Sequence, residues 1–354
     1  MAALLRRVRV AQLHDPAFDP AAAQKLLDAV EARLRTITLR FGKLRDITAY
    51  LHALAKLRSP PPPPARSSSS SSPSSPGAPL APLVQPHELA LDLAAFATRS
   101  RVELITASPK RLSTLLWALL RLLPAESHGS EKLQVVLDRL ALVSLRQLGN
   151  YTPQDLRNLA LAYATFGPRP DGPARAASAS GAAPVPTPAG TAEGEQALDW
   201  PALAKRSAPA PTPDAREAAA AKRRTRNARM LQALTAELAA RSGNLAVPQP
   251  EPRDLALAAH ALSLAGLTAA ASPNTLALLS KAAAAAAEAL APGRAGPLAD
   301  AEVAGLLEAL AEAGVRHGPL LEATRTWAGA AGEALAPEVR ARLAGAFNRL
   351  GSEL

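Results

Sequence analysis

Residues 152–167 read TPQDLRNLALAYATFG, and this stretch carries the signals of one complete helix with both ends marked. Thr152 suits the N-cap and Pro153 suits the first turn. Asp155 lies in that turn and faces the positive end of the helix dipole. Apolar residues recur at intervals of three and four, which gives the helix one apolar face. Gly167, placed for a left-handed residue and followed by proline, predicts the end of the helix.

The same apolar register recurs along the chain. Helices of this kind are predicted to begin near residues 44, 109, 153, 252, 300 and 336. After removal of two inserts their starts lie about 40 residues apart, and each of the best matches follows a longer amphipathic helix. A single hairpin cannot bury its apolar face, whereas stacked hairpins bury a continuous core. We therefore predict an all-α protein, an α-solenoid of about six helical hairpins of ~40 residues each.

Two low-complexity inserts interrupt the predicted repeats. They are rich in Pro, Ser and Ala and cannot bury enough apolar surface to offset the entropy of ordering, so disorder is predicted. The proline run at 60–64 suits a plain spacer or a ligand for an aromatic groove. The predicted division is an irregular or transit-like segment at 1–23, a helical repeat at 24–58, a linker at 59–85, repeats at 86–167, an insert at 168–221 and repeats at 222–354.

Composition argues against several classes of function. The chain of 354 residues contains no cysteine, which excludes disulfides and thiolate metal sites, and its six scattered histidines lack metal-binding spacing. The longest apolar run, residues 255–271, is shorter than the ~20 residues of a membrane span. No nucleophile motif, phosphate-binding loop or dinucleotide fingerprint is present. We therefore expect no enzymatic activity, no catalytic residue, no metal, no cofactor and no membrane span.

Positive charge is concentrated in the first two-thirds of the chain. The formal net charge is +10. Residues 1–58 carry 11 Lys and Arg against 5 Asp and Glu, whereas residues 250–354 carry 8 against 11. Such an asymmetry is the footprint expected of a protein that binds a polyanion such as RNA. A solvated surface with arginine-biased codon usage would give the same total charge.

Two stretches resemble the octotricopeptide repeat family of green-algal organelles and the related heptatricopeptide proteins. They are residues 153–164, PQDLRNLALAYA, and residues 109–119, PKRLSTLLWAL. The unit at 252 is less similar, and the others share mainly the apolar spacing. The resemblance implies RNA binding in a mitochondrion or chloroplast, in transcript maturation, stability or translation, or as a ribosome component. Implied partners are organellar mRNA or rRNA and ribosomal or other organellar proteins. Three Arg and no acid in the first 14 residues are compatible with the end of a transit peptide.

Candidate RNA contacts fall into three groups. Polar residues beside the apolar stripe of the marked helices are candidates for base contacts: Arg111, Ser113, Thr114, Arg157 and Asn158. The sharpest basic cluster follows the second insert and suits phosphate contact: Lys222, Arg223, Arg224, Arg226 and Arg229. A more diffuse basic patch comprises Arg33, Arg35, Arg40, Lys43 and Arg45. Solvent exposure without a ligand is the alternative for each group.

Acidic residues recur in the first turn of the marked helices, at Asp46, Asp155, Asp254, Glu302 and Glu338. The helix dipole accounts for this position, so a catalytic role is not inferred. The first hypothesis is an organellar protein that holds RNA without catalysis. The alternative is a protein–protein scaffold built on the same solenoid within an organellar complex.

Overall fold

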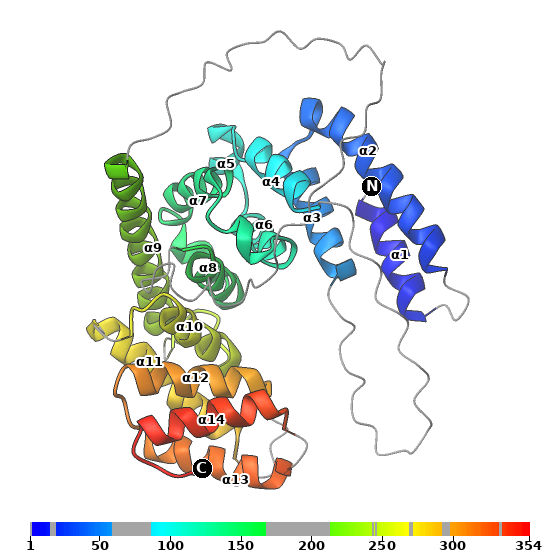
Figure 1. The fold of residues 1–354 in the computed structure, drawn as a ribbon. Helices are drawn as coiled ribbons and strands as arrows, with labels where there is room; N and C mark the ends of the chain where they lie inside the picture. Colours follow the sequence, from blue (N-terminus) through cyan, green and yellow to red (C-terminus); the bar gives the residue numbers. More distant parts are fainter. Residues whose placement is uncertain are drawn as a thin grey trace.

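The computed structural model describes residues 2–14, 19–58, 86–167, 213–242, 244, 246–268, 272–291, 298–332 and 335–354. All regular secondary structure within these residues is helical, as predicted (Figure 1). The helices are α1 (Ala2–His14), α2 (Pro20–Phe41), α3 (Leu44–Arg58), α4 (Pro86–Ala97), α5 (Arg101–Thr106), α6 (Pro109–Leu122), η1 (Ala125–Ser127), α7 (Glu131–Ser144), η2 (Leu148–Asn150), α8 (Pro153–Phe166), α9 (Pro213–Arg241), α10 (Pro252–Leu264), α11 (Pro273–Ala289), α12 (Asp300–Glu312), α13 (Gly318–Ala331) and α14 (Pro337–Arg349). The linker at 59–85 and residues 168–212 of the second insert lie outside the described residues.

Six helices form a first row. They are α3, α6, α8, α10, α12 and α14, and each packs against the next. These are the six marked helices, and their observed starts agree with the predicted starts to within one residue. The residues that set the apolar register, such as Leu112, Leu156 and Leu255, are buried. Helix α1 packs against α3 and extends the row at its N-terminal end.

The intervening helices form a second row. Helix α2 contacts α4, and contacts continue from α4 to α7, α9, α11 and α13 in turn. Pairs such as α8 with α9 and α10 with α11 join the two rows. One cluster of buried apolar side chains runs between the rows, from Leu5 to Leu350. Each helix therefore buries one face against the other row and its flanks against its neighbours in the same row.

The N-terminal segment differs from its prediction. Residues 1–23 were expected to be irregular, but α1 occupies Ala2–His14 and α2 begins at Pro20. Leu5 and Val8 lie one turn apart on α1 and are buried. Packing of this short apolar stripe against α3 stabilises a helix that the flanking Asp-Pro pairs did not predict.

Two separate helices, α4 and α5, precede α6. The helical stretch before α6 is interrupted, since α4 ends at Ala97 and α5 begins at Arg101. The Ser100 hydroxyl accepts the backbone N–H of Glu103 at 3.3 Å, which caps the new helix.

Gly167 ends α8 for a different reason from the one predicted. Its backbone is extended, with φ −72° and ψ 154°, rather than left-handed. A Cβ atom at this position would lie 2.6 Å from Nδ2 of Asn227 on α9, so glycine permits the close approach of that side chain. Left-handed glycines do close three other helices of the first row, at Gly266, Gly314 and Gly351.

Candidate nucleic-acid interface

Two of the residues predicted to contact bases instead join neighbouring helices of the first row. Ser113 on α6 is fully buried, and its hydroxyl donates to the carboxylate of Asp155 on α8. Nη1 of Arg157 on α8 donates to Oδ1 of Asp254 on α10 at 2.8 Å, and only 12% of the Arg157 side chain is exposed. Both side chains are therefore occupied inside the helix packing and are not presented at the surface.

The contact between Arg253 and Glu302 extends this series from α10 to α12. Nε of Arg253 lies 2.7 Å from Oε1 of Glu302. Like Asp155 and Asp254, Glu302 also accepts a backbone N–H from the residue three positions before it, here that of Ala299 at 3.0 Å. We call these six side chains the carboxylate ladder: Ser113, Asp155, Arg157, Asp254, Arg253 and Glu302. The first-turn acids thus join successive helices as well as capping their own, a role that the dipole argument missed.

Burial disfavours the charged form of Asp254, the second acid of the carboxylate ladder. Removal of the Asp254 carboxyl from water raises its pKa, and the attraction of Arg157 only partly opposes this. Asp254 is therefore held by directed hydrogen bonds at a net electrostatic cost, as is common for buried ion pairs.

The remaining base candidates, Arg111, Thr114 and Asn158, are partly buried. Oγ1 of Thr114 donates to the Lys110 carbonyl in its own helix at 2.6 Å. Arg111 lines a hollow of about 490 Å³ together with Lys43 and Arg45 at the start of α3. The structure therefore brings together residues that the sequence placed in two separate groups.

The diffuse basic patch is distributed over α2 and the start of α3. Arg33 on α2 is exposed, and Arg35 and Arg40 belong to the same helix. Lys43 and Arg45 are exposed, and Nε of Arg45 lies 3.2 Å from the adjacent Asp46 carboxylate, a contact too exposed to contribute much stability.

The basic cluster on α9 divides into an anchor and an exposed set. Arg226 donates to Oδ1 of Asp138 at 2.6 Å and to Oε1 of Gln134 at 2.8 Å, both on α7. Asn227 is buried and donates to the Tyr163 carbonyl of α8 at 3.2 Å. These contacts fix α9 against both helices. Arg226 thus has a packing role, while three other members of the cluster are exposed: Lys222, Arg224 and Arg229.

A second arginine holds the other end of α9. Arg241 is buried, and its guanidinium donates to the carbonyls of Leu148 at 3.1 Å and Gly149 at 3.0 Å, and to that of Tyr151. Its Nη2 lies 2.8 Å from the Glu237 carboxylate. The short η2 helix before α8 is therefore fixed to α9 through its carbonyl oxygens.

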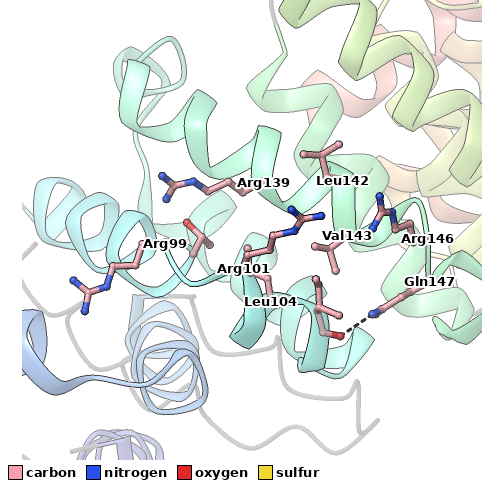
Figure 2. Close-up of a pocket in the computed structure, with 10 residues that line it drawn as sticks. Arg99, Arg101, Leu104, Arg139, Leu142, Val143, Arg146 and Gln147 are labelled. Atoms are coloured by element: carbon pink, nitrogen blue, oxygen red, sulfur yellow. Dashed lines mark hydrogen bonds between the residues drawn. The ribbon is translucent and has the colours of Figure 1, made fainter.

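Four arginines that were not among the sequence candidates lie around one pocket between α4–α5 and α7. We call it the arginine pocket; its volume is about 430 Å³. Figure 2 shows the side chains that line it: Thr98, Arg99, Arg101, Leu104, Ile105, Arg139, Leu142, Val143, Arg146 and Gln147. The break between α4 and α5 creates one wall. The Ser-x-x-Glu capping motif at residues 100–103 was the available signal for that break.

In the described part of the chain, His, Asp and Glu side chains nowhere gather in a group of three or more that could hold a metal ion. The described helices include none with the length and apolar character needed to cross a membrane. No known protein family matches the chain, and comparison with curated protein sequences gave no match either.

Proposed function

We propose that this protein holds RNA without catalysing a reaction on it, through the exposed basic side chains of α9. Residues 218–229 contain five Lys and Arg and no acid. The supporting observation is that Arg226 is bonded to α7 while Lys222, Arg224 and Arg229 are left exposed. A helix fixed in this way presents positive charge at a defined place, and neutralised phosphates would release counterions on binding.

We further propose that the two rows of helices constitute an α-solenoid of about six hairpins, similar to the octotricopeptide repeat proteins. The support is the agreement between the ~40-residue spacing and the order in which the first-row helices pack. An organellar location, and organellar mRNA or rRNA as the target, rest on the sequence resemblance alone.

The salt dependence of binding to a fluorescein-labelled single-stranded RNA tests the RNA-holding proposal. The triple variant Lys222→Ala, Arg224→Ala, Arg229→Ala removes the exposed set and leaves Arg226 in place. If each side chain neutralises one phosphate, the slope of log affinity against log salt becomes shallower by about 2. A matched triple variant on exposed C-terminal arginines, Arg316→Ala, Arg340→Ala and Arg349→Ala, removes the same charge and is expected to leave the slope unchanged. Equal losses in the two triple variants would contradict a binding role for α9.

A protein scaffold is the second candidate function, and one observation favours it. Val102 on α5 and Leu142 on α7 are 72% and 68% exposed, and these two helices contact each other. Exposed apolar side chains grouped in this way mark protein contact surfaces more often than RNA contact surfaces.

A further inference from the structure

The arginine pocket combines positive charge with exposed apolar surface. One wall carries Arg101 and Ile105, one turn apart on α5, and the other carries Arg139 and Arg146 with Leu142 between them. Ile105 and Leu142 are exposed although both are large and apolar. The pocket thus offers hydrophobic contact and hydrogen-bond donors on the same surface (Figure 2).

The positive charge of the pocket is not neutralised by its own lining. None of the 10 described residues that line it is acidic. The nearest acids in the sequence bind elsewhere: Glu103 accepts the backbone N–H of Leu44 at 3.0 Å, and Asp138 accepts from Arg226 at 2.6 Å. Asp92 on α4 accepts from Nζ of Lys132 at 2.6 Å. A ligand with carboxylates would therefore supply the missing counter-charge.

Two of the arginines are held in place by the protein. Nη1 of Arg139 donates to the Ala95 carbonyl at 3.3 Å, and the Arg99 guanidinium lies 3.8 Å from the centre of the Phe96 ring. Such contacts reduce the side-chain entropy that a ligand would otherwise have to overcome. They leave donors on both guanidinium groups for further hydrogen bonds.

Arg139 and Leu142 lie about one turn apart on α7, and Arg146 follows in the turn after the last helical residue, Ser144. A helix lying alongside α7 would present acids to both arginines and an apolar stripe to Leu142 between them.

We infer that the arginine pocket is a docking site for an acidic amphipathic helix of a partner protein. Carboxylates of that helix bind Arg101, Arg139 and Arg146, because guanidinium–carboxylate pairs can form two parallel hydrogen bonds. Its apolar stripe covers Ile105 and Leu142. RNA fits this surface less well, because the described residues of the lining expose aliphatic side chains and include no aromatic ring on which a base could stack. The inference does not depend on RNA binding by α9.

A synthetic four-turn peptide provides the test. It carries glutamates and leucines on one face of the helix, and its binding to the full chain is measured by fluorescence anisotropy. We expect the double variant Arg139→Glu, Arg146→Glu to weaken binding at least tenfold and Leu142→Ser to weaken it several-fold. The matched controls are Arg349→Glu and Leu276→Ser, which change exposed residues on α14 and α11 and should bind the peptide as the wild type does. Circular dichroism checks that each variant is folded.

Three outcomes would overturn the inference. A glutamate peptide without leucines that binds equally well would show that the apolar surface is irrelevant. An RNA oligonucleotide that binds more tightly than the peptide and is lost in the same double variant would make the pocket part of an RNA surface. Residues 193–200 of this chain, EGEQALDW, are themselves acidic and apolar. Tighter binding of a synthetic peptide with this sequence would replace the partner protein by the chain's own insert. The triple variant at Lys222, Arg224 and Arg229 should still bind the peptide. Its binding to RNA tests the RNA proposal separately.

Discussion

Arginine has opposite roles in the carboxylate ladder and around the arginine pocket. In the first row Arg157 donates to the acid of the next helix and is almost covered. Arg101 and Arg146 instead line an open pocket, and Arg224 and Arg229 are exposed on α9. The comparison shows that a count of basic residues cannot locate a binding surface in this chain. What matters is whether a neighbouring helix supplies the acceptor.

The largest expected effect concerns Arg241, the buried arginine at the end of α9. Arg241→Ala leaves the carbonyls of Leu148, Gly149 and Tyr151 without their donor, so we expect a loss of about 3 kcal/mol in the free energy of unfolding. Urea denaturation measures it. Arg229→Ala, on the same helix but exposed, is the control and should change stability by less than about 0.5 kcal/mol. Equal effects at the two positions would break the distinction between packing and exposed arginines.

The ladder residue Arg157 is expected to rank second. Arg157→Ala leaves the Asp254 carboxylate buried with only backbone hydrogen bonds and should cost about 2 kcal/mol. Loss of Arg157 raises the pKa of Asp254 further, so the cost should be largest at pH 7 and should shrink as the pH falls through that raised pKa and the carboxyl is protonated. Arg253→Ala is the comparison; its side chain is 49% exposed, so about 1 kcal/mol or less is expected. A cost for Arg157→Ala that does not vary with pH would contradict this account.

The sequence was sufficient to predict where the first-row helices begin, but not which of their polar side chains are buried. Apolar spacing and proline starts are local signals, and they placed all six first-row helices. Their position beside the apolar stripe made Arg157 and Ser113 candidates for base contacts. Whether the next helix covers such a residue depends on how the helices stack, which no local pattern shows. The same limit applies to Gly167, whose neighbour Asn227 is 60 residues away in the chain.

A closer test of first-row packing uses two glycines inside helices. A Cβ atom on Gly305 of α12 would lie 2.9 Å from the imidazole ring of His260 on α10, so Gly305→Ala should cost about 1–2 kcal/mol despite the better helix propensity of alanine. Gly345 on α14 has nothing within 4 Å of the same position, so Gly345→Ala should gain up to about 1 kcal/mol. Thermal unfolding of both variants gives the signs. If Gly305→Ala increased stability, α10 and α12 would move apart at little cost despite the contact of Arg253 with Glu302 between them.

The smallest expected effect comes from Glu308, where α12 meets α14. Arg342 donates to both oxygens of the Glu308 carboxylate, at 2.8 and 2.6 Å, and these bonds lower the pKa of Glu308. A carboxyl whose pKa is lower in the folded state contributes stability that is fully present above its unfolded pKa, near 4.5, and is lost as the pH falls through the folded value. Glu308→Gln should therefore be less stable than the wild type at pH 7, and the difference should shrink between pH 4.5 and pH 3.

Urea titrations of the two proteins across this range measure that difference. His260 lies nearby, and burial lowers its pKa below the ordinary 6.5, so both proteins are followed from pH 7 downward. Because neutral His260 is favoured in the fold, its contribution is lost as the pH falls below its unfolded pKa in both proteins. The stability difference between wild type and Glu308→Gln could instead stay constant to pH 3. The ion pair between α12 and α14, unlike the buried pair of Arg157 and Asp254, would then make no charge-dependent contribution to stability.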